Sequence, residues 1–217
     1  MFTDSCSHEF ISPKFGQSRA PCPALNALAN HGYISHDGKN LTVPELVRAL
    51  QQVYHLSFTL ALVLSLAAVI FCGNGFRLDL GDLCKRNKIE HPGSLVHDDC
   101  LPGQQFASSV PSSKLLRCFL RYAPRGHGLN LDDFATARVD RESKLALPLD
   151  QLHSQIATGE SALTWLVMKD QHDEVPKEII KEWYGEERLP HGWVPPATAI
   201  TLLSARGVAK MIAQRMK

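Results

Sequence analysis

The sequence has no excess of charge of either sign. Its 23 Lys and Arg residues are balanced by 22 Asp and Glu residues, which leaves a formal net charge of +1 over 217 residues. A nucleic-acid-binding domain usually carries a basic patch, so we expect no nucleic-acid partner. Disorder is excluded too, because 44 % of the residues are hydrophobic and 21 % are charged, as in globular domains. The length is typical of one domain, and we assign residues 1–217 to it.

The cysteine spacing of a structural zinc site is also missing. Six cysteines are present, but none forms a CxxC pair and no such pair is followed by HxxxH, so we expect no zinc. Cys22 has a distinct context, which is described below. We expect the other five to be small buried hydrophobic residues, namely Cys6, Cys72, Cys84, Cys100 and Cys118.

The N-terminus MFTDSCSHEF lacks a basic stretch followed by an apolar one, so no secretory signal is predicted. If Met1 is the true start, we expect an intracellular, cytoplasmic protein whose cysteines are mostly thiols. The uncharged apolar run over residues 56–72 is shorter than the roughly 20 residues that span a bilayer. It predicts a buried core helix, with a membrane-spanning helix as the alternative.

Apolar residues recur at helical spacing along much of the chain, whereas long alternating strands are absent. Thr42 and Glu45 form a capping box before one helix, and Ser57 caps the next, which runs to about residue 71. Further helices are predicted over residues 23–31, 131–141, 149–156, from just before 160 to 168, 175–183 and 197–215, the last as one helix or as a pair around Gly207. Residues 73–113 form a long loop region. The predicted fold class is all-α with long irregular loops.

The stretch Pro21-Cys22-Pro23 is chemically informative. Proline is favoured at the first position of a helix, so Pro23 begins the helix and Cys22 is its N-cap. The sulfur then faces the free amides of the first turn, which lowers the pKa of a thiol and favours a thiolate ligand for a soft metal. The alternative is a buried cysteine that happens to cap a helix.

The thirteen residues 21–33, PCPALNALANHGY, closely resemble the signature of the haem-thiolate peroxidases, the chloroperoxidase and unspecific peroxygenase relatives known mainly from fungi. Two more family elements follow in order: Glu90-His91-Pro92-Gly93-Ser94, 68 residues after Cys22, and Gly159-Glu160-Ser161, whose glutamate follows Glu90 by 70 residues. The C-terminal stretch ERLP at 187–190, with Gly192-Trp193, is also similar. The resemblance covers residues about 10 to 195, and the length resembles the short subgroup.

The resemblance implies that Cys22 is the proximal ligand of a haem b iron, where a thiolate favours O–O cleavage. It implies that Glu160, on the opposite haem face, moves the proton between the two peroxide oxygens. We expect apolar surroundings that raise the pKa of Glu160, whereas the alternative is a solvated glutamate in a first helical turn. His91 would orient Glu160, and His153, seven residues before Glu160, is a second candidate for that role.

The resemblance further implies a Mg²⁺ ion held by Glu90, Ser94 and the backbone carbonyl of His91, an oxygen-only set that suits magnesium. The sequence departs from the family at Pro92, where the family usually has aspartate. We expect this change to remove the hydrogen-bond partner of His91. Either Asp98 or Asp99 replaces it, or the acid–base device is weaker.

The predicted function is that of a haem-thiolate peroxidase or peroxygenase. It would use hydrogen peroxide to oxidise, oxygenate or halogenate a small organic substrate, as a step of intracellular biosynthesis and secondary metabolism. One alternative is a haem-dependent rearrangement or cyclisation that needs no peroxide, because Pro92 alters the distal network. The other is a membrane-associated helical protein. The sequence identifies neither the substrate nor the oligomeric state.

Overall fold

The computed structural model describes residues 8–101, 103–123 and 127–217, so Cys6 lies outside the described residues. Over these ranges the chain forms α-helices, two short helical turns and isolated β-bridges, but no strand. The predicted all-α fold class is confirmed. The helices are α1 (Pro23–Asn30), α2 (Val43–Tyr54), α3 (Phe58–Phe71), α4 (Ser113–Leu120), α5 (Leu131–Glu142), α6 (Gln151–Met168), α7 (Lys177–Ile180) and α8 (Leu202–Arg215), with the turns η1 (Leu80–Cys84) and η2 (Lys181–Gly185).

The first three helices begin at the residues that the sequence predicts. Thr42 and Glu45 form the capping box of α2: the Thr42 hydroxyl accepts from the Glu45 amide, and the Glu45 carboxylate accepts from the Thr42 amide. Ser57 caps α3 by accepting from the amide of Leu60. These side chains satisfy backbone donors that have no partner inside their helices, and so fix where each helix starts.

The second half of the chain differs from the prediction in three places. Helix α4 was not predicted, and the side chain of its N-cap residue Ser112 makes no capping hydrogen bond. Helix α6 is continuous, since Gly159 adopts helical geometry inside it and does not interrupt it. Helix α8 is likewise one helix through Gly207, but it begins at Leu202, five residues later than predicted.

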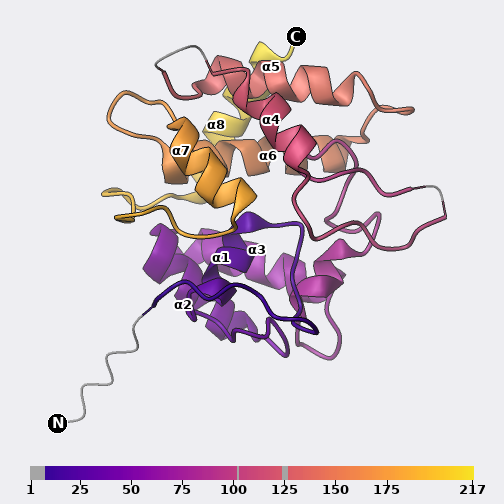
Figure 1. Cartoon of the computed structure of the whole chain (residues 1–217), viewed down its shortest axis with the longest axis vertical. Helices are drawn as coiled ribbons and strands as arrows, with labels where there is room; N and C mark the ends of the chain where they lie inside the picture. The colour runs from indigo at the N-terminus through magenta and orange to yellow at the C-terminus, as the bar shows by residue number, and fades with distance from the viewer. Residues whose placement is uncertain (1–7, 102, 124–126) are drawn as a thin grey trace.

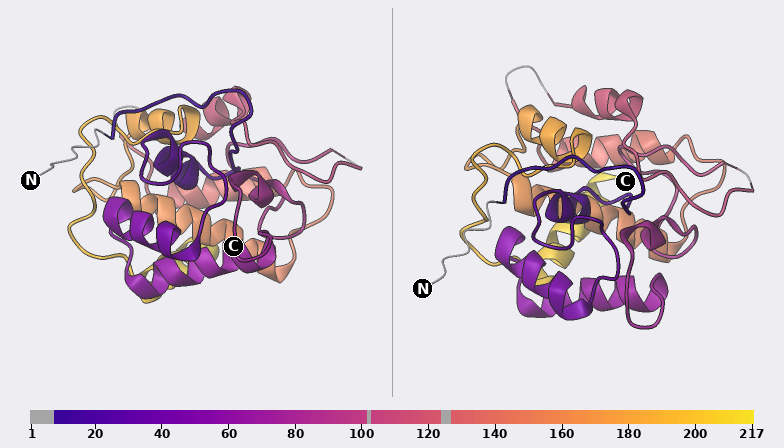
Figure 2. Two further views of the ribbon diagram at one scale, coloured as in Figure 1. Left: turned by 90° about the horizontal axis from the view of Figure 1, so that it is seen from below. Right: turned by 60° about the horizontal axis from the view of Figure 1, so that its bottom comes forward.

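The helices form two groups (Figure 1). Helices α1, α2 and α3 lie together in the lower half of that view, and α4 to α8 lie above them. Helix α1 lies between the α2–α3 pair and α7 in both views of Figure 2. It contacts η2, and the hydroxyl of Tyr54 at the end of α2 donates to the Ala24 carbonyl at 2.8 Å. Helix α1 is therefore held from both sides.

The apolar run over residues 56–72 forms the 14-residue helix α3. No helix among the described residues is long and apolar enough to cross a membrane. Only part of α3 is buried, with Leu60 and Ala61 in the core and Val63 and Ile70 exposed.

The five described cysteines are free thiols, as predicted. Cys72 and Cys84 are buried, so the prediction of small core residues is confirmed for these two. The prediction is wrong for Cys100 and Cys118, which are partly exposed. Cys100 follows an irregular loop, and its sulfur contacts the carbonyl of Phe106 at 3.2 Å.

Candidate active site

Cys22 is the N-cap residue of α1, and Pro23 occupies the first turn, as predicted. The amides of Leu25 and Ala24 lie near the sulfur and favour the thiolate. Burial nevertheless dominates and raises the pKa of the thiol to about 11, with smaller contributions in the same direction from the Glu160 and Glu187 carboxylates. The prediction of a lowered pKa is therefore wrong for the chain alone, because desolvation outweighs two backbone amides.

Glu160 lies in the middle of α6 and faces His91 from the loop before α4. The His91 Nε2 and the Glu160 Oε2 are 3.5 Å apart, so the structure brings these two predicted residues together. Burial lowers the pKa of His91, but the Glu160 carboxylate and the Pro92 carbonyl outweigh it, and the net pKa is raised. The Glu160 side chain is 56 % exposed, so it is open to solvent in the chain alone. The alternative of a glutamate in a first helical turn is wrong, because Glu160 lies in the middle of α6.

Pro92 does not deprive His91 of its partner. The Pro92 carbonyl accepts a hydrogen bond of 2.8 Å from the His91 Nδ1. Proline lacks a backbone N–H donor but keeps its carbonyl oxygen as an acceptor. Asp99 does not replace the family aspartate, because its carboxylate accepts from the Gly93 amide and from Arg141, each at 2.7 Å. The expectation that Pro92 removes the hydrogen-bond partner of His91 is therefore wrong, whereas the alternative of a peroxide-independent reaction stays a hypothesis.

His153 lies near the pair but has another partner. Its Nδ1 is 2.6 Å from the carboxylate of Asp150, the N-cap residue of α6. Its ring centroid is 6.2 Å from that of His91. His153 is thus a neighbour of His91 whose Nδ1 contacts Asp150, while its Nε2 is buried without a hydrogen-bond partner among the described residues. Its role as a second orienting residue stays a prediction.

The predicted magnesium ligands are only partly accounted for. The Glu90 Oε2 is buried without a hydrogen-bond partner among the described residues, and burial raises the pKa of this carboxyl. The Ser94 hydroxyl accepts from the amides of His97 and Val96, at 3.1 and 3.4 Å. No cluster of three His, Cys, Asp or Glu residues suited to a metal occurs in the described part of the chain. The predicted set contains only one such side chain, so it stays a prediction.

Two arginines of α5 hold the loop that carries His91. Neither was predicted from the sequence. Arg138 is 1 % exposed and donates to the Gly93 carbonyl at 2.7 Å. Arg141 donates to the Ser94 carbonyl at 2.9 Å. The signal in the sequence is a pair of arginines three residues apart, which lie on one face of a helix. They fix the loop backbone and thereby the position of the His91 ring.

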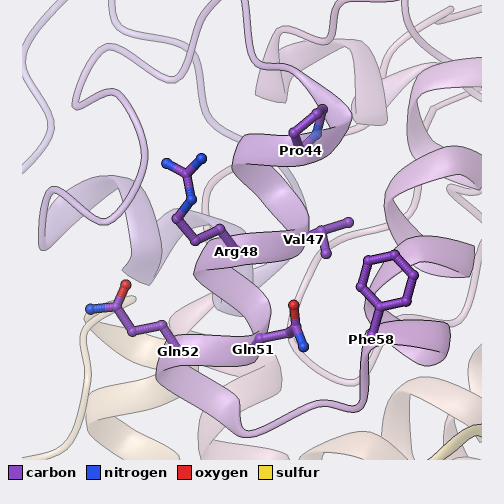
Figure 3. Close-up of a pocket in the computed structure, with 6 residues that line it drawn as sticks. All are labelled: Pro44, Val47, Arg48, Gln51, Gln52 and Phe58. Carbon is purple, nitrogen blue, oxygen red and sulfur yellow. The ribbon is translucent and has the colours of Figure 1, made fainter.

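Two surface cavities lie away from these residues. One, of about 540 Å³, is lined by α2 and by Phe58 at the start of α3 (Figure 3). Val47 and Phe58 face each other there, while Arg48 and Gln52 project to the other side of α2. The other cavity, of about 840 Å³, includes Tyr33 and Arg48. Cys22, His91 and Glu160 line neither, so these grooves are not part of the predicted site.

The sequence profile of peroxidase family 2 matches residues 8–198. The match covers most of the chain, and the chain therefore belongs to this family, the chloroperoxidase family. The resemblance drawn from the three sequence elements is thereby confirmed, and the family implies a haem cofactor.

Several curated fungal peroxidases are similar in sequence. Chloroperoxidase of Leptoxyphium fumago is 28 % identical over 221 residues, which cover 90 % of this chain and 59 % of that protein. The aromatic peroxidase fscJ of Fusarium equiseti is 47 % identical over 76 residues, 34 % of this chain and 17 % of that protein. The dothistromin biosynthesis peroxidase dotB of Dothistroma septosporum is 31 % identical over 74 residues, 34 % of this chain and 18 % of that protein. The chain thus spans less than two thirds of each relative.

The donors in this chain fit a haem. A cysteine sulfur at a helix N-terminus would be a suitable ligand for the iron of a haem. The Glu160 carboxylate is exposed although most of its α6 neighbours are buried, and it acts electrostatically on Cys22. A thiol and an accessible, histidine-paired carboxylate thus occupy one region of the fold.

Proposed function

We propose that this chain is a haem-thiolate peroxidase or peroxygenase that uses hydrogen peroxide to oxidise or oxygenate a small organic molecule. The observation that carries the proposal is the placement of the Glu160 carboxylate 3.5 Å from His91, in a chain whose Cys22 is the N-cap residue of α1. Family membership supports the same chemistry.

In this proposal Cys22 binds haem b iron through its sulfur. The bound haem supplies an iron centre with a thiolate ligand, which favours cleavage of the peroxide O–O bond. The thiol must lose its proton for this, and the amides of Ala24 and Leu25 favour the ionised sulfur.

Glu160 holds and moves the proton. As a carboxylate it accepts a proton from one peroxide oxygen, and as an acid it returns that proton to the departing oxygen. A carbonyl only accepts hydrogen bonds, so the Pro92 carbonyl requires that the His91 Nδ1 carries hydrogen. The Nε2 is then the nitrogen that exchanges a proton with the Glu160 Oε2, which leaves the Glu160 Oε1 for peroxide.

We further propose that Mg²⁺ binds at Glu90, with Ser94 and the His91 carbonyl as the other protein ligands. The support is the Glu90 Oε2, a buried atom without a hydrogen-bond partner in the described part of the chain, together with the preference of Mg²⁺ for oxygen ligands. Metal analysis of purified wild type and Glu90→Ala tests this proposal. Magnesium in wild type that is lost in the variant supports it, and equal content contradicts it.

The substrate that we propose is a small aromatic compound of fungal secondary metabolism. Two similar proteins are named as an aromatic peroxidase and as a dothistromin biosynthesis peroxidase. Product analysis with a panel of phenolic and polycyclic aromatic compounds plus peroxide tests the substrate class, and turnover of non-aromatic compounds alone would contradict it.

The first prediction concerns the iron ligand. Wild-type protein loaded with haem is expected to show the red-shifted ferrous-CO Soret band of thiolate ligation, and Cys22→Ala is expected to lose it, because the variant has no sulfur at the start of α1. Cys118→Ala is the matched control, since this partly exposed thiol lies on α4. A wild-type spectrum without the band, or an unchanged spectrum of Cys22→Ala, refutes the proposal.

A further inference from the structure

Glu187 is a buried acid outside the machinery described above. It lies in the C-terminal segment after η2, is 7 % exposed and has a φ of 52°. A residue other than glycine pays a conformational cost in this left-handed region. The fold therefore holds the backbone of Glu187 in place against a local preference.

Those contacts lead to α1. The Glu187 Oε1 accepts a hydrogen bond of 2.6 Å from the Asn26 Nδ2, and the Glu187 backbone carbonyl accepts one of 3.0 Å from Asn30. Two residues further on, the amide of Leu189 donates to the His31 Nε2 at 3.1 Å. The C-terminal segment thus makes three hydrogen bonds to α1 and its C-cap residue, between residues that lie 157 to 161 positions apart in the sequence.

The Asn26 side chain also hydrogen-bonds to the turn that contains Cys22. Its Oδ1 accepts from the Ala20 amide at 2.9 Å, and its Nδ2 donates to the Ala20 carbonyl at 2.7 Å. The Asn26 amide itself donates to the Cys22 carbonyl at 3.1 Å. Both hydrogens of the Asn26 side-chain amide are therefore used, one by Ala20 and one by Glu187. Asn26 is fully buried, so loss of either partner leaves a donor unsatisfied.

We infer that Glu187 is a positioning residue for the Cys22 sulfur and acts through the Asn26 side chain, which closes the turn from Ala20 to Asn26. The inference rests on the proposed role of Cys22 as the haem ligand. Partners that orient a metal ligand usually affect metal affinity or activity by about 10- to 100-fold when removed. Here the partner comes from the far end of the chain, so the iron ligand takes its orientation from a segment distant in sequence.

Three variants of haem-loaded protein test this inference. Glu187→Ala removes the acceptor, and Glu187→Asp withdraws it by one methylene, whereas Glu187→Gln keeps an oxygen that can accept from Asn26. We expect the first two to weaken haem affinity about tenfold and to reduce the red-shifted ferrous-CO Soret band. Glu187→Gln should restore both to within about twofold of wild type. Glu186→Ala is the matched control, because Glu186 is the exposed neighbour in sequence.

A second readout needs no haem. The rate at which iodoacetamide labels Cys22 in haem-free protein, followed by mass spectrometry of its peptide, is expected to rise about threefold or more in Glu187→Asp, because the turn that shields the sulfur loosens. It should stay near the wild-type rate in Glu187→Gln and Glu186→Ala. If Glu187→Ala does not fold, the labelling rate of Glu187→Asp decides whether Glu187 orients the Cys22 sulfur.

The two proposals fail differently. A wild-type protein that lacks the thiolate Soret band refutes the role of Cys22, while the labelling rates still decide whether Glu187 orients the sulfur. A wild-type protein that shows the band, with folded Glu187→Asp equal to wild type in spectrum, haem affinity and labelling rate, overturns the inference alone.

Discussion

Single residues decide the chemistry of the candidate site, and the His91–Glu160 pair shows how. Burial lowers the pKa of His91 whereas hydrogen bonding raises it. The two ring nitrogens of His91 have different partners. The Nδ1 donates to the Pro92 carbonyl, while the Nε2 faces Glu160. A side chain that holds one nitrogen fixed can exchange protons with the other, which is the usual role of an oriented histidine.

The second prediction follows at this scale. Glu160→Gln keeps the size of the side chain but cannot take up the peroxide proton, so peroxide-dependent turnover is expected to fall by about 10²-fold or more. The thiolate Soret band should remain, because Cys22 is untouched. Glu178→Gln, an exposed glutamate on α7, is the matched control. Turnover of Glu160→Gln close to wild type would assign proton transfer to another group.

Helices and loops decide whether these residues meet. The loop that carries His91 has no regular structure of its own over residues 91–101, and the guanidinium of Arg138 ties it to α5. This guanidinium also donates to the Glu142 carboxylate at 3.0 Å through its Nε. The buried Arg138 side chain thus joins the loop to α5 through the Gly93 carbonyl.

The third prediction tests that tie. Arg138→Ala leaves the Gly93 carbonyl and the Glu142 carboxylate without their donor and opens a cavity, so the free energy of unfolding is expected to drop by about 3 kcal/mol. Arg206→Ala, on the exposed face of α8, should change it by less than about 0.5 kcal/mol. Chemical denaturation of both variants measures the difference. Equal stability of the two would show that the loop is held elsewhere.

The fourth prediction concerns α8, which is one helix through Gly207. A Cβ at Gly207 would meet no atom within 4 Å, so Gly207→Ala is expected to raise the free energy of unfolding by about 0.5–1 kcal/mol through reduced backbone entropy in the unfolded chain. Gly73→Ala is the contrasting variant, since its Cβ would lie 2.3 Å from the Arg77 carbonyl oxygen. It should lower the thermal midpoint. A destabilised Gly207→Ala would indicate that the helix is not continuous there.

The elements that the sequence predicted well are those with a local signal. Thr42 and Ser57 start α2 and α3 through bonds to amides three residues away, so short sequence windows contain the whole cause. Helix α4 and the π-helical turn η2 have no such cap, and their position depends on packing. At Gly207 the sequence left one helix or a pair of helices open, because a glycine weakens a helix, and tertiary contacts of α8 with α5 and α6 stabilise the single helix.

The candidate site shows the same division. The identity of Cys22, His91 and Glu160 followed from motifs, but their environment did not. The pKa of the Cys22 thiol depends on burial by the whole fold, and the carbonyl of Pro92 is a backbone atom that residue identity does not reveal. The role of Glu187 depends on a partner 161 residues away. Motifs thus predict which atoms take part, while long-range packing determines their state.

In the molecule as a whole, the C-terminal segment packs against α1, the helix that begins after Cys22. The N-terminal group of helices carries the sulfur, the C-terminal group carries Glu160, and the segment after η2 returns to α1. Arg19 is part of this closure: the residue is 8 % exposed, and its guanidinium donates to the Asn30 Oδ1 at 2.7 Å. The contacts among Arg19, α1 and Glu187 form a junction between the two ends of the sequence. Ionisation of a group inside this junction therefore changes the free energy of unfolding of the whole chain.

The fifth prediction uses that link. Burial raises the pKa of Glu187 from 4.5 to about 7, although the hydrogen bond from Asn26 and the charge of Arg19 oppose the shift. A group whose pKa is higher in the folded state stabilises the fold fully below its unfolded pKa, and this stabilisation is lost as the pH rises through the folded pKa. Each pKa unit corresponds to about 1.4 kcal/mol. We therefore expect the free energy of unfolding of wild type, relative to Glu187→Gln, to fall by about 3 kcal/mol as the pH rises through this interval.

The measurement is chemical denaturation of wild type, Glu187→Gln and Glu186→Gln at several pH values across the interval from 4.5 to about 7. Subtracting the Glu187→Gln curve isolates this carboxyl, because all other titrating groups are common to both proteins. Glu186→Gln controls for the loss of a nearby negative charge, since the Glu186 side chain is 55 % exposed. It should run parallel to wild type. If the Glu187→Gln curve also runs parallel to wild type, Glu187 ionises in the fold as it does in the unfolded chain, and the junction is hydrated rather than closed.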